Sequence, residues 1–103
     1  MTRFPLLRPY RTELWPKVVP EMDRSAAALA SDQHGTVTAR VTQRISGEQA
    51  RRYDVEYTRN GKGLVERLGF VLRAKTEYEL LCRFERGKSA AACDQLFRTF
   101  TLI

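Results

Sequence analysis

The chain has 103 residues, of which 43% are hydrophobic, and its 18 Lys and Arg against 12 Asp and Glu give a net charge of +6 at pH 7. This length supports a single domain over residues 1–103, and the apolar fraction is that of a folded chain rather than a disordered one. No stretch approaches the roughly 18 consecutive apolar residues of a transmembrane helix, and no charged segment followed by an apolar one marks a secretory signal.

Residues 1–19 form a proline-rich basic arm, and all the prolines of the chain lie within residues 1–20. Proline fixes φ and removes a backbone donor, so we expect an extended or irregular arm without a long helix. Its many apolar residues predict that it packs on the body of the domain, for instance as a short edge strand, and a truncated N-terminal hairpin is the alternative. As the densest basic stretch, the arm is also expected to contact a partner, through Arg3, Arg8, Arg11 and Trp15.

A helix is predicted over residues 20–32. Pro20 suits the first turn of a helix, and Glu21 and Asp23 suit the positive end of its dipole. Small apolar residues then recur at helical spacing, namely Met22, Ser25, Ala26, Leu29 and Ala30. Gly35 ends this pattern, which leaves His34 at the exit of the helix.

From Gly35 onward the apolar period changes to two, which predicts four antiparallel strands over residues 36–45, 52–58, 63–73 and 77–85. Asn60-Gly61 is a strong hairpin signal, because a type I′ turn needs positive φ at both central positions. Each strand has one apolar and one polar face, so we expect a meander with one buried and one solvated face. Glu66 falls on the buried face and is therefore expected near the edge.

A second helix is predicted after Ser89, which is a candidate N-cap. An apolar stripe at i, i+3, i+4 and i+7 is expected to face the sheet, and consists of Cys93, Leu96, Phe97 and Phe100. The β-branched and apolar residues at 99–103 favour a short final strand. The predicted fold class is α+β, an antiparallel β-sheet meander flanked by helices, with both helices on the one buried face.

The basic residues are scattered rather than gathered in a patch. Along the predicted strands arginines alternate with acids, as in Arg52-Asp54-Glu56 and Glu66-Arg67, which is typical of a solvated sheet face with cross-strand ion pairs. A nucleic-acid interface needs a basic stripe, ideally with exposed aromatic side chains. Nucleic acid is therefore disfavoured as a partner, although a small basic nucleic-acid-binding module in the cytoplasm remains the alternative function.

Cys82 and Cys93 lie on the inward faces of neighbouring elements, the last predicted strand and the second helix. These elements must fold back on each other to bury their apolar faces, which favours a disulfide between the two sulfurs. Two reduced cysteines in the core are the alternative. A disulfide would indicate an oxidising compartment. Two cysteines and one distant histidine are too few for a metal site.

No catalytic constellation is recognisable in the sequence. His34 lies near Asp32, but a helix end favours such a donor side chain for structural reasons alone. Glu77 and Glu79 fall on the outward face of their strand, where nothing is expected to shift their pKa values for acid–base work. The chain contains no nucleophile elbow, zinc-protease motif or phosphate-binding glycine loop. We therefore expect neither enzyme activity nor a cofactor.

Residues 45–102 resemble the Mog1/PsbP-like domain family in three motifs. ISGEQARRY at 45–53 is similar to the family's v-x-G-x-x-A turn and strand, YELLC at 78–82 to its y-x-l strand, and CDQLFRTFTL at 93–102 to its closing helix. The resemblance implies an α/β/α sandwich around an antiparallel sheet and a non-catalytic binding or assembly role. Secreted bacterial members often carry one cysteine after the y-x-l strand and another in the final helix, which suits the two cysteines here. The family's N-terminal hairpin with its P-x-x-W motif is not visible, unless residues 3–15 are a diverged form.

Together these observations predict a non-catalytic, extracytoplasmic binding or assembly domain that is secreted, periplasmic or lipid-anchored, with a cytoplasmic location as the alternative. It would hold a protein or an apolar ligand on a sheet face, at an edge or on the arm. Membrane tethering would come from an N-terminal segment that this sequence lacks, such as a signal peptide or lipobox. A ligand-binding pocket domain, with the pocket between sheet and helices, is a second alternative.

Overall fold

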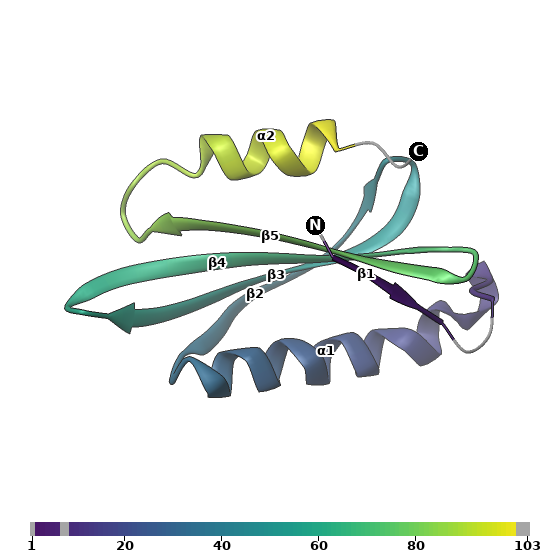
Figure 1. The fold of residues 1–103 in the computed structure, drawn as a ribbon, viewed down its shortest axis with the longest axis horizontal. Helices are drawn as coiled ribbons and strands as arrows, with labels where there is room; N and C mark the ends of the chain where they lie inside the picture. Colours follow the sequence, from purple (N-terminus) through teal and green to yellow (C-terminus); the bar gives the residue numbers. More distant parts are fainter. Residues whose placement is uncertain (1, 7–8, 101–103) are drawn as a thin grey trace.

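The computed structural model of the chain describes residues 2–6 and 9–100. In chain order the elements are β1 (Thr2–Pro5), the 3-10 helix η1 (Thr12–Leu14), α1 (Trp15–Asp32), β2 (Thr36–Ile45), β3 (Glu48–Arg59), β4 (Lys62–Arg73), β5 (Thr76–Glu85) and α2 (Ala91–Thr99). The strands form one five-stranded antiparallel sheet in the order β1-β5-β4-β3-β2. Helix α1 lies along one face of this sheet and α2 along the other (Figure 1). The fold is therefore α+β, as predicted, with the sheet between the helices.

The prediction that both helices cover the same face is wrong, and the central strand β4 shows why. Leu68, Phe70 and Leu72 pack with α1, whereas Val71 packs with Phe97 of α2. Residues 65–72 of β4 are all buried, and its apolar residues therefore occupy both faces of the strand rather than alternating with polar ones. Each face of the sheet therefore has its own core.

The register between β4 and β5 places the apolar faces of these two strands on opposite sides of the sheet. Phe70 is paired with Glu79, and Val71 with Tyr78. Glu79 therefore lies on the α1 side beside Phe70, while Tyr78 lies on the α2 side. A shift of one residue in the pairing of β5 with β4 would exchange these two faces. The apolar pattern within β5 alone does not reveal which register the turn imposes.

Helix α1 begins at Trp15 rather than at the predicted Pro20, so the expectation of no long helix within residues 1–20 is wrong. Pro16 lies in the first turn, where the N–H that proline lacks has no helical partner. Pro20 lies inside the helix, where its missing N–H would have met the Pro16 carbonyl. Both prolines are exposed, so water can reach that carbonyl.

The exit of α1 agrees with the predicted stop at Gly35. The Gly35 N–H donates to the Ala30 carbonyl at 2.8 Å, and His34 adopts a φ of 56°. A Cβ on Gly35 would lie 2.4 Å from the Glu56 carbonyl oxygen, so the close approach of the chain to β3 requires glycine. His34 is exposed, and its place in the structure is this chain reversal.

The predicted hairpin at Asn60-Gly61 is confirmed, with φ values of 53° and 77° at the two residues. A bulge interrupts β2, where the register shifts between Val37 and Ala39. Because of this shift, Val37 packs into the core beneath α1. Simple alternation along β2 would instead place Val37 on the same face as Ala39.

Helix α2 packs on the sheet through its buried residues Cys93 and Phe97. A Cβ on Gly69 would lie 2.7 Å from the Phe97 ring, so β4 makes room for this ring by carrying no side chain. Leu96, predicted to face the sheet, is instead 39% exposed. The stripe expected on α2 is thus narrower than the sequence suggests.

The ends of α2 differ slightly from their predicted positions. The N-cap is Ala90 rather than Ser89, but the Ser89 hydroxyl accepts a hydrogen bond from the Ala91 N–H at 3.1 Å. Thr99 belongs to α2 rather than to a strand. The rest of the predicted final strand includes residues 101–103, which lie outside the described residues.

Strand β1 pairs with only part of β5. Its residues face Thr76–Glu79, and beyond Glu79 the outer edge of β5 has no partner strand among residues 2–6 and 9–100. Two further backbone hydrogen bonds attach the arm to the β4–β5 turn, from Leu6 N–H to the Lys75 carbonyl at 2.8 Å and from Tyr10 N–H to the Ala74 carbonyl at 2.6 Å.

Candidate functional site

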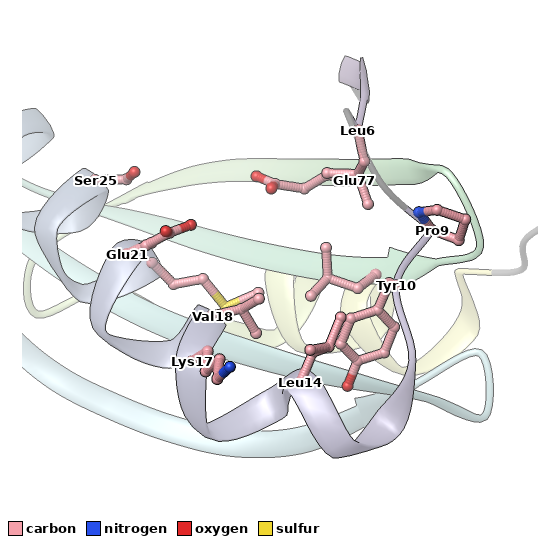
Figure 2. Close-up of a pocket in the computed structure, with 11 residues that line it drawn as sticks. Leu6, Pro9, Tyr10, Leu14, Lys17, Val18, Glu21, Ser25 and Glu77 are labelled. Carbon is pink, nitrogen blue, oxygen red and sulfur yellow. The ribbon is translucent and has the colours of Figure 1, made fainter.

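A groove runs between α1 and the part of the sheet formed by β1, β5 and β4. Its first section is a cavity of about 580 Å³, whose apolar wall consists of Leu6, Tyr10, Leu14, Val18, Met22 and Leu72 (Figure 2). A second section of about 550 Å³ continues along α1 and shares Leu6, Ser25 and Glu77 with the first. We call the two sections together the α1 groove.

Two glutamates of β5 line the α1 groove. Glu77 points from its strand into the first section, toward the side of α1 that carries Glu21 and Ser25 (Figure 2). Glu79 lines the second section beside Phe70. The expectation that Glu77 and Glu79 lie on a solvated face is wrong, because the register of β5 turns these residues toward the helix that covers that face.

Burial in the groove changes the acidity of both carboxyl groups. Desolvation raises the pKa of Glu77, and the negative charges of Glu79 and Glu21 raise it further. Desolvation likewise raises the pKa of Glu79, with a second contribution from Glu66. The prediction that nothing would shift these pKa values is therefore wrong.

The acids of the α1 groove are not neutralised within the described part of the chain. Across residues 2–6 and 9–100, the side chains of Glu77 and Glu79 form no hydrogen bond or ion pair, and the same holds for the side chains of Glu21 and Asp32 at the helix wall. Lys17 is the one basic residue among the lining residues. A groove with a surplus of acids thus lies in a chain of net charge +6.

Glu66 lies behind the groove in β4 and is only 1% exposed, so its expected place near an edge is wrong. One carboxylate oxygen accepts a hydrogen bond from the Arg83 guanidinium at 2.9 Å. The other oxygen, Oε2, is buried without a hydrogen-bond partner among the described residues, as is the Tyr57 hydroxyl. Buried polar atoms without hydrogen-bond partners are rare in proteins.

Arg3 and Trp15, two of the contact residues predicted on the arm, lie on opposite sides of the sheet. Arg3 is exposed in β1, paired with Tyr78 on the α2 side, whereas Trp15 is half-buried and packs on the core beneath α1. Arg11 is exposed just before η1, and Arg8 lies outside the described residues. A role for Arg3, Arg8 and Arg11 in contacting a partner stays a prediction, while Trp15 contributes to the core at the start of α1.

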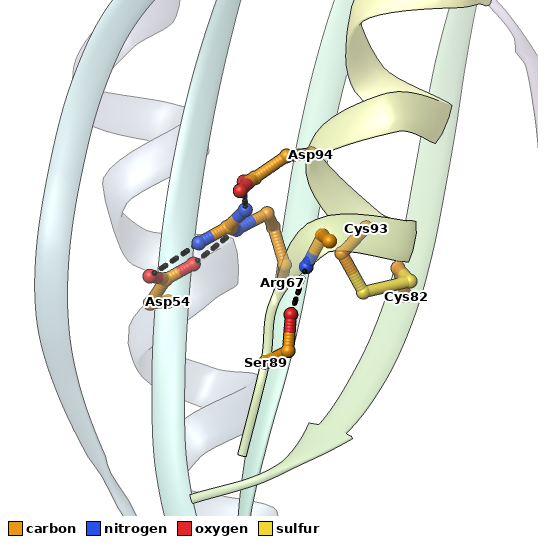
Figure 3. The surroundings of a disulfide bond; sticks show 7 residues. Asp54, Arg67, Cys82, Ser89, Cys93 and Asp94 are labelled. Atoms are coloured by element: carbon orange, nitrogen blue, oxygen red, sulfur yellow. Dashed lines mark hydrogen bonds and ion pairs between the residues drawn. A yellow bond between two sulfur atoms is a disulfide. The ribbon is translucent and has the colours of Figure 1, made fainter. Parts of the chain in front are cut away.

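Cys82 and Cys93 form the disulfide that the sequence favours, with their Cα atoms 5.6 Å apart. Beside it, Arg67 of β4 is 6% exposed and its guanidinium bridges two acids (Figure 3). It donates to Asp54 of β3 at 2.9 Å and to Asp94 of α2. These hydrogen bonds raise the pKa of Arg67, with the bond to Asp54 as the largest cause. The disulfide and Arg67 together fasten the first turn of α2 to the sheet.

Among the described residues that line the α1 groove, apolar and acidic side chains predominate. Its lining includes no histidine and no cysteine. Within residues 2–6 and 9–100, no three residues among His, Cys, Asp and Glu are grouped so that they could hold a metal ion. In the same part of the chain, no helix has both the length and the apolar character needed to cross a bilayer. What the groove offers is an apolar surface with two half-buried carboxylates.

Sequence reasoning missed this groove because it depends on which face of β5 meets α1. The available signal was the double-sided apolar run of β4, which predicts a cover on both faces of the sheet. No family model, curated protein or solved structure matches this chain. Membership of the Mog1/PsbP-like family therefore stays a prediction that rests on the three short motifs.

Proposed function

We propose that this chain is a non-catalytic, extracytoplasmic binding domain whose α1 groove holds an apolar ligand with a cationic group. The observation that carries this proposal is the pair Glu77 and Glu79, which are half-buried in an apolar groove without a cationic partner among the described residues. Removing a carboxylate from water is unfavourable unless an opposite charge or a hydrogen-bond donor compensates it. An amine or guanidinium group of a ligand would supply that compensation.

The apolar wall of the groove would bind the remainder of such a ligand. Leu14, Val18 and Met22 of η1 and α1 line the groove together with Leu72 of β4. Burial of apolar surface contributes roughly 25 cal/mol per Å², so a short alkyl or aromatic group can supply most of the affinity while the carboxylates select the charge.

The compartment is proposed from the disulfide. Disulfides persist in oxidising environments and are rare where cytosolic thiol systems keep cysteines reduced. Mass spectrometry of native protein, alkylated without reductant, tests this. We expect no alkylated cysteine before reduction and two afterwards, whereas free Cys82 and Cys93 thiols in freshly isolated protein would contradict the proposed compartment.

A matched series of eight-carbon ligands tests the groove itself. Octylammonium, octanol and octanoate differ mainly in the charge of the head group, and Trp15, the only tryptophan, packs on the core next to the groove and gives a fluorescence signal. We expect octylammonium to bind about tenfold or more tighter than octanoate, since a charge-assisted hydrogen bond forms with one head group only. The preference should grow as rising pH ionises Glu77.

Glu77→Gln should remove most of the preference for octylammonium while octanol binding is retained. Glu85→Gln is the matched control, because Glu85 is an exposed acid of the same strand that pairs with Lys62 at 3.8 Å and does not line the groove. Equal binding of octylammonium and octanoate by the wild-type protein would refute the proposal. An equal loss in both variants would attribute the preference to general charge rather than to the groove.

The nucleic-acid alternative has less support. Arg51, Arg67 and Arg83 each face an acid across the sheet or from a helix, so these arginines do not form an open basic stripe. We expect no binding to a generic oligonucleotide. Binding whose affinity falls as the salt concentration rises would restore that alternative.

A further inference from the structure

A third cavity lies on the other side of the sheet, between the strands β2 and β3 and helix α2. Its volume is about 320 Å³, and its lining residues are Gln43, Arg44, Arg52, Asp94, Phe97 and Arg98. It shares no lining residue with the α1 groove, which lies on the α1 face. We call this cavity the α2 pocket.

Arg52 of β3 supplies the first reason to expect a ligand in the α2 pocket. Its Nε is buried and donates to no acceptor in residues 2–6 and 9–100. Arg67 in the adjacent strand β4 shows the usual arrangement, since its guanidinium is fully engaged with Asp54 and Asp94. A buried N–H of a charged group without an acceptor is unfavourable, and an acceptor in the pocket would satisfy it.

The charge balance of the pocket supplies the second reason. None of the three lining arginines, Arg44, Arg52 and Arg98, forms an ion pair within the described residues. The one acid in the lining, Asp94, is already paired with Arg67. The lining therefore carries three guanidinium groups without an ion pair, from Arg44 and Arg52 of the sheet and Arg98 of the helix, with the Gln43 side chain as a neutral donor. Arg44 donates to the Gly47 carbonyl at 3.0 Å, which leaves Arg52 and Arg98 without a side-chain acceptor among the described residues.

We propose that the α2 pocket binds a phosphate group through Arg52 and Arg98. The planar fork of arginine donates two parallel hydrogen bonds to an oxyanion, and two such groups match the charge of a phosphate monoester, about −1.5 to −2 at pH 7. A carboxylate carries a smaller charge, −1, and would leave more of the positive charge of the pocket uncompensated. This site is independent of the cationic ligand proposed for the opposite face.

Arg98 has one competing role, because it lies in the last turn of α2, where a cation stabilises the helix dipole. If that were its only role, Arg98→Gln would lower the melting temperature without changing the binding of phosphate. Arg52 lies in mid-strand and has no such alternative.

The test is a titration of the whole protein with inorganic phosphate, followed by ¹H–¹⁵N NMR at the arginine Nε resonances. We expect a saturable shift of the Arg52 Nε–H signal, and a much weaker, non-saturating response to acetate. Arg52→Gln and Arg98→Gln should each reduce phosphate affinity by about tenfold or more, as expected for a lost hydrogen bond between charged groups. Arg40→Gln is the matched control, because Arg40 is an exposed arginine of β2 outside the pocket.

A second arm identifies the source of the phosphate group. Co-sedimentation with vesicles containing phosphatidic acid, lost in Arg52→Gln, would assign the site to a lipid head group, while phosphate binding without co-sedimentation would assign it to a soluble phosphate. Either result supports the site. No saturable shift at Arg52, or an equal loss of affinity in Arg40→Gln, would overturn it. Since the octylammonium experiment uses other residues and another face, it can fail or succeed independently.

Discussion

The Tyr53 hydroxyl donates a hydrogen bond to the Asp23 carboxylate, and this bond joins the centre of β3 to the first half of α1. Arg51 completes the group, with its guanidinium 3.3 Å from the same carboxylate oxygen and its Nε donating to the Tyr53 oxygen at 3.3 Å. Burial, followed by the bond to Asp23, raises the pKa of Tyr53 to about 12. The tyrosine therefore stays protonated far above the range in which a free tyrosine ionises.

We expect Tyr53→Phe to lower the free energy of unfolding by about 1 kcal/mol at neutral pH, the usual net value of a lost hydrogen bond. In the wild-type protein the unfolded chain loses the phenolic proton near the ordinary pKa of 10.0, while the folded state keeps it up to the raised pKa. The free energy of unfolding therefore falls as the pH rises between these two pKa values. Phenylalanine has no such proton, so the variant lacks this loss. The difference in free energy of unfolding between the two proteins should therefore shrink as the pH rises above 10.0. Urea unfolding at about pH 8 and about pH 11 measures it, and an unchanged difference would argue against the raised pKa.

Gly69→Ala should lower the free energy of unfolding by about 1–3 kcal/mol, because the new methyl group would meet the Phe97 ring. The combined variant Gly69→Ala/Phe97→Leu should be less destabilised than the sum of its two single variants, because a smaller side chain on α2 leaves room for the methyl group. Simple additivity in urea unfolding would show that the two residues do not compete for the same space.

Replacement of Cys82 and Cys93 by serine should cost about 2–3 kcal/mol, since the disulfide closes a short loop between residues separated by 11 positions. The loss should be concentrated in α2, which depends on the disulfide and on Arg67 for its attachment. Amide hydrogen exchange tests this: the amides of α2 should exchange faster while those of β3 and β4 change little. A uniform increase over the sheet would mean that the disulfide supports the whole domain instead.

Glu77→Gln should change how stability depends on pH. Because the folded state raises the pKa of this carboxyl group, folded protein holds the proton more tightly, and the free energy of unfolding falls as the pH rises from about 4.5 through the raised value. The variant has no titrating carboxyl group at this position, so its free energy of unfolding does not fall in this way. Relative to wild type, its stability should increase as the pH rises through the raised pKa of Glu77 and then level off. Thermal unfolding at several pH values measures the difference. Glu85→Gln, at an exposed position, should show no comparable trend.

The local signals of the sequence specified most of the elements of this fold. Asn60-Gly61 marks a hairpin because few residue pairs accept positive φ at both positions. Gly35 marks the end of α1 because a side chain there would collide with the Glu56 carbonyl. The alternation of apolar residues in β5 places Cys82 on the inward face, and the helical spacing of apolar residues in α2 does the same for Cys93. The disulfide between them therefore follows from two local patterns in the sequence. Such signals act within a few residues of the chain and do not depend on the tertiary arrangement.

The features that escaped prediction depend on how elements meet. Alternation shows that Tyr78 and Glu79 point opposite ways, but only the pairing with β4 decides which of them faces α1. The α1 groove, with Glu77 and Glu79, therefore could not be derived from the strand patterns alone. The helical start at Trp15 was hidden for another reason, because Pro16 and Pro20 disfavour helix in general yet occupy positions that α1 tolerates.

The short length of β1 has a consequence for the behaviour of the protein at high concentration. Beyond Glu79, the outer edge of β5 has no partner strand among residues 2–6 and 9–100, and Leu81 beside it is 48% exposed. Such an edge is a template for the strand of another molecule. The charged residues Arg83 and Glu85 oppose that pairing. Since Arg83 also neutralises buried Glu66, a neutral residue in its place would both destabilise the interior and uncover the edge. One side chain thus protects the molecule from unfolding and from self-association.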